Sequence, residues 1–104
     1  MSAVQIVDEA EAQARAIDAW WTENRRAAPS LFARELANAV ALLGAAPGAG
    51  ERFRRSAIPG VRRLVLPRTR NVLYYVHDHK NDIVYILAIW GGPRGNDPTL
   101  KDPR

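Results

Sequence analysis

Seven arginines and no carboxylate occupy the stretch from Arg52 to Val76, and their chemistry is the easiest in this chain to interpret. The guanidinium group is planar and permanently charged, and its N–H donors fit carboxylate and phosphate groups. A solvated cationic face is one interpretation. The absence of acids favours the other, which is contact with phosphate or with an acidic partner. The arginines are Arg52, Arg54, Arg55, Arg62, Arg63, Arg68 and Arg70.

Two histidines, His77 and His79, flank Asp78 near the end of a predicted strand. A structural zinc site needs about four ligands, and the chain has no cysteine and only these two histidines. We therefore expect no metal and no cofactor. A histidine acting as general base in RNA cleavage is chemically possible, but a solvated hairpin turn is the favoured interpretation. The catalytic residues, if there are any, stay unassigned.

Aromatic residues supply the remaining candidates. Tyr74 and Tyr75 are adjacent in a predicted strand, so their side chains lie on opposite faces of the sheet. One of them packs against the helices, and the other is available to stack on a nucleotide base; parity does not decide which. Trp20 and Trp21, in a predicted helix, are interpreted as packing residues.

Three segments rich in β-branched and aromatic residues predict the strands that hold these side chains: Val61–Leu66, Asn71–His77 and Ile83–Trp90. Their short connections make them antiparallel neighbours. Because the third segment is apolar at almost every position, it should be central, with both faces covered. A helix hairpin covers one face only, so the other face should need a partner or form an apolar groove.

The first half of the chain predicts this helix hairpin. A helix over 8–26 should begin with a capping box of Asp8 and Glu11. Ser30 should cap a second helix, which Gly44 ends in the left-handed conformation. A short strand at 4–7 precedes the hairpin and should run antiparallel to the strand that follows it. The segment 52–59 is expected to be irregular, with Phe53 and Ile58 in the edge of the core.

The predicted class is thus α+β, in the order βααβββ, with the helix hairpin packed on one face of a mainly antiparallel four-stranded sheet. At 104 residues, with 47% hydrophobic and 25% charged residues, the chain should form a single globular domain over 1–104, with an irregular tail from about residue 92. Neither a signal peptide nor an apolar run of roughly 20 residues is present. We therefore expect a cytoplasmic protein that does not enter a membrane.

Three short segments carry a family resemblance: Gly60-Val61-Arg62-Arg63-Leu64, Val72-Leu73-Tyr74-Tyr75-Val76 and Ile86-Leu87-Ala88-Ile89-Trp90-Gly91-Gly92-Pro93-Arg94. Together with the order of the elements, they resemble the RelE/ParE family of bacterial toxins from type II toxin–antitoxin systems. The resemblance implies a cognate antitoxin that binds the toxin directly, through an acidic and apolar segment, in a hetero-oligomeric complex.

The two branches of this family imply different targets. RelE-like members cleave mRNA at the ribosome without a metal, whereas ParE-like members inhibit DNA gyrase. Here Asn71 stands where RelE-like members commonly have a basic residue, and there is no long basic C-terminal helix. The ending Trp90-Gly91-Gly92-Pro93-Arg94 is more similar to ParE. The resemblance therefore implies a gyrase inhibitor that is not an enzyme. A ribosome-dependent mRNA endonuclease is the alternative, and loss of toxicity a third possibility.

Two sets of site residues follow from the resemblance and the arginine cluster. Arg94 is expected to contact the target, or else to pair with Asp97 and fix the tail. The expected target-binding residues are Arg63, Arg68, Arg70, Arg94, Tyr75 and Trp90. The expected antitoxin-binding residues are Arg62, Arg63, Arg70, Tyr74, Ile86 and Trp90.

Overall fold

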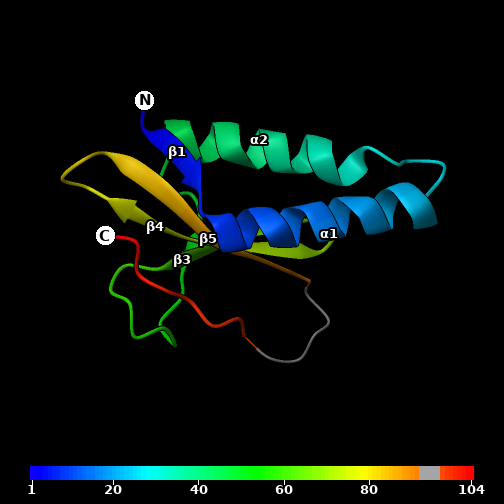
Figure 1. Ribbon diagram of the computed structural model, residues 1–104. Helices are drawn as coiled ribbons and strands as arrows, with labels where there is room; N and C mark the ends of the chain where they lie inside the picture. The colour runs from blue at the N-terminus through cyan, green and yellow to red at the C-terminus, as the bar shows by residue number, and fades with distance from the viewer. Residues whose placement is uncertain (92–96) are drawn as a thin grey trace.

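The computed structural model describes residues 1–91 and 97–104, and it confirms the α+β class. Two antiparallel helices lie along one face of a five-stranded sheet with the strand order β1-β5-β4-β3-β2 (Figure 1). The sheet thus has one strand more than predicted. No helix in the described part of the chain is long and apolar enough to cross a membrane. The elements are β1 Ala3–Ile6, α1 Asp8–Asn24, α2 Leu31–Ala45, β2 Glu51–Arg52, β3 Arg62–Leu66, β4 Asn71–Asp78 and β5 Ile83–Gly91.

Strand β5 is central, as its apolar sequence predicts, and this decides where β1 pairs. It has β4 on one side, antiparallel, and β1 on the other, parallel, with Val4 opposite Val84. The expectation that β1 runs antiparallel to the strand predicted at Val61–Leu66 was wrong. Strands β5 and β3 both pair antiparallel with β4, and β1 is parallel to β5, so β1 and β3 run in the same direction. The additional strand, β2, lies in the segment predicted to be irregular and pairs with Arg62 and Arg63 of β3.

The helix ends differ from the predicted ones. Val7, not Asp8, is the N-cap of α1, and it makes no side-chain cap bond. Asp8 and Glu11 lie in the first turn, where acidic side chains stabilise the helix by interacting with its dipole. Ser30 is the N-cap of α2, but its side chain makes no cap bond either. Gly44 lies buried inside α2, where a Cβ would lie 3.2 Å from the carbonyl oxygen of Ser2. The close approach of the N-terminal segment therefore explains this glycine.

A β-bulge in β5 sets which side chains face the helices. Tyr74 is opposite Ala88 and Tyr75 is opposite Ile86, so Leu87 is an additional residue in the strand. Ile86 consequently packs into the core beneath the helices, while Leu87 and Ala88 both belong to a second core on the outer face of the sheet.

The chain itself covers the outer face of the sheet. Phe53, Ile58 and Leu100 pack in the same cluster as Leu87 and Ala88, and Phe53 is only 8% exposed. Figure 1 shows the segment after β2 and the C-terminal tail on the side of the sheet away from the helices. The predicted burial of Phe53 is confirmed. The expectation that this face needs a partner or forms an apolar groove was wrong, because residues distant in sequence cover it.

Candidate functional site

A hydrogen-bonded turn that carries two exposed arginines joins β3 to β4. We call Pro67, Arg68, Thr69 and Arg70 the arginine turn. The Glu35 carboxylate of α2 accepts the backbone N–H of Arg68 at 2.8 Å, the N–H of Thr69 at 3.1 Å and the Thr69 hydroxyl at 2.6 Å. One side chain of the helix hairpin thus satisfies both backbone donors and fixes the turn against α2.

Two further features stabilise the turn from the sheet side. Asn71, 5% exposed, donates its side-chain N–H to the Thr69 hydroxyl at 3.0 Å, and the Arg70 N–H donates to the Leu66 carbonyl at 2.8 Å. Arg70 has a φ of 66°, in the left-handed region. The side chains of Arg68 and Arg70 are exposed, and neither takes part in an ion pair within the described residues. The turn therefore presents two guanidinium groups that make no ion pair, next to the Glu35 carboxylate that holds its backbone.

Replacing Arg70 with glycine should relieve this strain. A non-glycine residue in the left-handed region costs about 1–2 kcal/mol, so Arg70→Gly should leave the free energy of unfolding unchanged or raise it by up to about 1 kcal/mol. Arg68→Gly is the matched control: Arg68 has no positive φ, so it should lose about 0.5–1 kcal/mol through backbone entropy. Urea unfolding followed by tryptophan fluorescence measures both, and equal losses would contradict the expected strain at Arg70.

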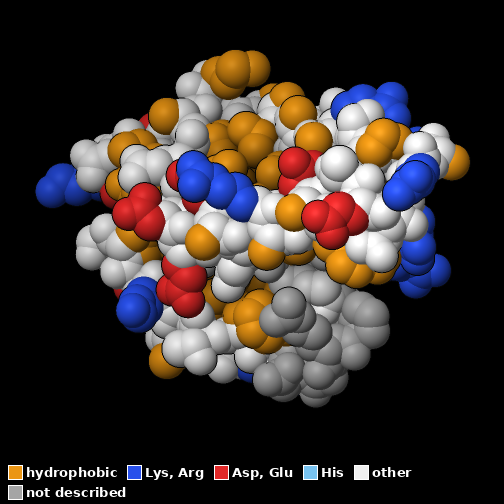
Figure 2. Space-filling model, turned by 45° about the vertical axis from the view of Figure 1, so that its right-hand side comes forward, with side chains coloured by type: hydrophobic (Ala, Val, Ile, Leu, Met, Phe, Trp, Pro, Cys, Tyr) orange, Lys and Arg blue, Asp and Glu red, His pale blue; other side chains and the backbone are white. Residues whose placement is uncertain are grey.

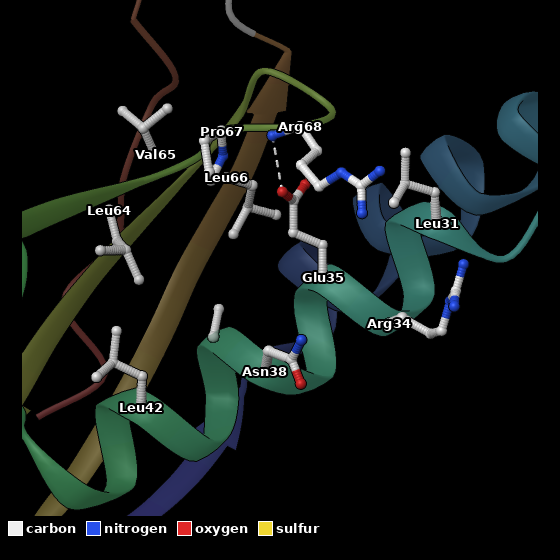
Figure 3. A pocket seen from close by; sticks show the side chains of 11 residues that line it. Leu31, Arg34, Glu35, Asn38, Leu42, Leu64, Val65, Leu66, Pro67 and Arg68 are labelled. Atoms are coloured by element: carbon white, nitrogen blue, oxygen red, sulfur yellow. Dashed lines mark hydrogen bonds between the residues drawn. The ribbon is translucent and has the colours of Figure 1, made fainter. Parts of the chain in front are cut away.

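An apolar groove runs between α2 and β3, and the arginine turn closes one end of it (Figure 3). In Figure 3, Leu42 of α2 and Leu64 of β3 point toward one another across it. Leu42 is 44% and Val65 47% exposed, so two large hydrophobic side chains are only half covered. We call this the α2–β3 groove; it is lined by Leu31, Arg34, Glu35, Asn38, Ala39, Leu42, Leu64, Val65, Leu66, Pro67 and Arg68.

The edge of β3 beside the groove is open. Strand β2 pairs only with Arg62 and Arg63, and no other described strand lies on that side. The Phe53 N–H donates to the Val61 carbonyl at 2.9 Å, which fixes the alternation along β3. Along a strand, every second residue directs its backbone N–H and C=O to the same adjacent strand. Val61, Arg63 and Val65 therefore all face the side of β2. Val65 therefore presents its N–H and C=O to the open edge, where an added strand can pair.

A second hollow lies on the other side of the arginine turn, against α1. Arg70 and Trp90 line it from the sheet, and Trp20, Trp21 and Arg25 line it from the helix. Trp21 packs against the core as predicted, but Trp20 is 47% exposed, which corrects the packing role expected for it. The Arg25 guanidinium lies 4.9 Å from the centre of the Trp20 ring, in a cation–π contact. We call this the α1 hollow.

The structure brings together only part of the predicted target-binding set. Arg68, Arg70 and Trp90 lie around the arginine turn. Arg94 lies outside the described residues; Asp97, its expected alternative partner, pairs with Arg55 at 3.1 Å. Tyr75 is fully buried, which corrects the role expected for it, because it has no surface with which to contact a partner.

The hydroxyl of Tyr75 has a structural role instead. It donates to the Pro47 carbonyl at 2.8 Å and accepts the Gly50 N–H at 2.9 Å. Burial raises the pKa of this phenol.

The predicted antitoxin-binding set is divided in the same way. Tyr74 and Ile86 are 3% and 0% exposed, so both belong to the core. This corrects the antitoxin contacts expected for them, because neither side chain reaches the surface. Arg63 pairs with Glu51 at 2.6 Å, and this hydrogen bond raises the pKa of Arg63. Arg62 lies at the end of β3 far from the arginine turn. Sequence reasoning missed Glu35, Leu42 and Val65; for Leu42 the available signal was an apolar residue beside the buried stripe of α2.

The histidines form a small surface cluster. His77 Nε2 lies 2.9 Å from Asp82 Oδ1, and the His77 and His79 ring centres are 4.2 Å apart. The Ser2 hydroxyl first, and His77 second, hold the pKa of Asp82 below its usual value. Across residues 1–91 and 97–104, no group of three or more His, Cys, Asp or Glu is placed to hold a metal ion.

Comparison with known families adds an independent finding. The family model described as the ParE toxin of type II toxin–antitoxin systems, parDE, matches residues 4–94. The match includes the helix hairpin, the arginine turn and the five strands, with β1 from Val4 onward. No curated protein matches the chain.

Proposed function

We propose, from the premise that this chain belongs to the ParE toxin family of type II toxin–antitoxin systems, that it inhibits DNA gyrase until its cognate antitoxin occupies the α2–β3 groove. The family makes the chain a toxin with an antitoxin partner. The choice of gyrase and the mode of neutralisation are the proposed steps. With gyrase and the antitoxin as its partners, the toxin would act in the cytoplasm.

The α2–β3 groove is the observation that carries the proposal for the antitoxin. Leu42 and Leu64 line the groove and would contact apolar side chains of the antitoxin. Arg34 and Arg68 also line it and would bind acidic side chains. The open backbone of Val65 lies at its rim. An extended segment that pairs with a sheet edge gains main-chain hydrogen bonds, while side-chain pockets give specificity. An acidic, apolar segment of the antitoxin fits all three features and would form a hetero-oligomeric complex with the toxin.

The arginine turn is the proposed contact with gyrase. Arg68 lines the α2–β3 groove, whereas Arg70 lines the α1 hollow together with Trp20 and Trp90. A protein bound in the groove would therefore cover one side of the turn. This arrangement explains neutralisation by simple obstruction, without a conformational change in the toxin. Interfaces are enriched in arginine and tryptophan because these side chains provide large, well-oriented contacts.

The test is a supercoiling assay with purified gyrase and relaxed plasmid. We expect the toxin to inhibit supercoiling, an equimolar amount of antitoxin to restore it, and the variant Arg68→Ala/Arg70→Ala to inhibit at least about tenfold less, the loss of about 1.4 kcal/mol of binding. The variant Arg15→Ala/Arg26→Ala is the matched control, because both arginines are exposed on or next to α1 and outside both hollows. It should inhibit like the native chain.

A ribosome-dependent mRNA cleavage assay is run in parallel with the supercoiling assay. Cleavage of mRNA with supercoiling unaffected would contradict the proposal and establish the endonuclease alternative. Inhibition of neither process would also contradict it, and would indicate a toxin fold without toxicity at these targets.

A further inference from the structure

A second cationic surface lies at the end of the sheet away from the arginine turn. It is a hollow of about 640 Å³ between the segment around β2, the start of β3, the end of β4 and the C-terminal residue. No Asp or Glu lines it, whereas acidic and basic side chains are interspersed on the face seen in Figure 2. Its cationic and titratable members are Arg52, Arg54, Arg62, His77, His79 and Arg104, and we call it the basic hollow.

Three of its guanidinium charges are uncompensated. Arg104 pairs with Asp102 at 3.0 Å. Arg62, by contrast, donates to the Gly50 carbonyl at 2.7 Å, which fixes its position without neutralising its charge. Arg52 and Arg54 are exposed, and no ion pair among the described residues includes them or Arg62.

The strand register makes this accumulation of charge more significant. Arg52 of β2 and Arg62 of β3 are direct cross-strand partners. The adjacent pair, Phe53 and Val61, is joined by a backbone hydrogen bond. Because bonded and non-bonded pairs alternate along an antiparallel ladder, Arg52 and Arg62 form a non-hydrogen-bonded pair. Side chains are closest at such pairs, and like charges directly opposite one another are destabilising. An anion between the two guanidinium groups would turn this repulsion into attraction.

We infer that the basic hollow binds the phosphodiester backbone of a nucleic acid. Guanidinium groups bind phosphate oxygens bidentately, and contacts to phosphate position a protein on nucleic acid without reading sequence. An isolated phosphate group carries a charge of about −1.5 to −2. Three uncompensated guanidinium groups exceed that charge, so the hollow matches more than one phosphate of a strand. The inference goes beyond the proposed function, since the basic hollow shares no residue with the arginine turn or the α2–β3 groove.

The experiment measures binding of the full chain to a fluorescently labelled DNA duplex of random sequence by anisotropy, over a series of salt concentrations and without gyrase. We expect binding whose logarithm falls linearly with the logarithm of salt. The variant Arg52→Ala/Arg54→Ala should bind at least about tenfold more weakly at low salt, with a salt slope smaller by about 1 for each contact removed. Both side chains are exposed, so the fold should survive, and circular dichroism checks that.

The control variant Arg15→Ala/Arg26→Ala removes the same charge from outside the basic hollow and should retain the native affinity and slope. Equal weakening by both variants would overturn the inference, because net charge alone would then explain binding. Absence of DNA binding would overturn it as well. Displacement of the duplex by inorganic phosphate at constant ionic strength would overturn the assignment to a strand in favour of an isolated phosphate site; resistance to phosphate supports the strand.

Discussion

Replacing Gly50 with alanine should lower the free energy of unfolding by about 2–3 kcal/mol, the upper part of the range for overpacked sites. A Cβ at this buried position would lie 2.5 Å from the Arg63 carbonyl oxygen and 2.8 Å from the Tyr75 hydroxyl. Neither neighbour can move away easily. Arg63 is held in the pairing of β2 with β3, and Tyr75 is fully buried in the main core.

The expected loss includes hydrogen bonds as well as the collision. Gly50 donates its N–H to the Tyr75 hydroxyl and accepts a bond from Arg62, so it ties the segment after α2 to β3 and β4. A shift that relieves the collision would lengthen these bonds. A buried polar group left without a partner costs about 1–3 kcal/mol. The effect is therefore structural, and it should appear equally in the presence and absence of any partner.

Gly48→Ala is the matched control for this prediction. An added Cβ at Gly48 meets nothing within 4 Å, and Gly60 is the only described glycine with a positive φ. Alanine there should be neutral or should stabilise by about 0.4–1 kcal/mol, because it reduces the entropy of the unfolded chain. Urea unfolding of the two variants measures the contrast, and similar midpoints would show that Gly50 is not the tight site the geometry indicates.

The regular elements of this fold were predictable because they depend on local periodicity. Strands β3, β4 and β5 begin and end within one residue of the predicted positions, and α1 ends two residues earlier than predicted. The pairing of β1 was not predictable in the same way. It depends on which edge of β5 is left open after β4 has paired, and nothing near Val4 in sequence carries that information.

Which side chains lie on each face of the sheet, and whether they are exposed, could not be predicted from local sequence for two physical reasons. The bulge at Leu87 changes the alternation of β5, so side-chain parity counted from one end fails at the other. Tyr74 and Tyr75 do lie on opposite faces, as predicted, yet both are buried, because the segment around Phe53 and the tail cover the outer face. Those segments have no periodic pattern that would indicate their position.

The candidate site also depends on contacts across long sequence separations. Glu35 binds the arginine turn from 33 and 34 residues away, and a single Glu on a helix gives no signal of such a role. The arginines themselves were recognisable by composition. Their separation into a turn at one end of the sheet and a hollow at the other follows only from the pairing of β3 with β4, which places Arg62 and Arg70 at opposite ends of one hairpin.

The α2–β3 groove gives the largest expected effect on partner binding. Leu42→Glu should weaken the complex with the antitoxin at least about 100-fold, equivalent to about 2.7 kcal/mol. Leu42 is 44% exposed in the toxin, so the new carboxylate stays solvated and the fold should tolerate it. In the complex the same carboxylate would be buried against Leu64 and apolar partner side chains, and burial of an unpaired charge is strongly unfavourable. The variant should therefore inhibit gyrase like the native toxin but escape neutralisation.

Ala41→Glu places the same charge one residue away, on an exposed part of α2 that does not line the groove. Because the carboxylate remains in water in both states, the antitoxin affinity of this control should stay within about twofold of the native value, since surface substitutions usually change free energies by less than 0.5 kcal/mol. Titration calorimetry gives the two affinities, and co-expression with the antitoxin gives the growth phenotype. Native affinity for Leu42→Glu would place the antitoxin elsewhere. Equal weakening by both variants would show that charge on α2, and not the apolar groove, governs the complex.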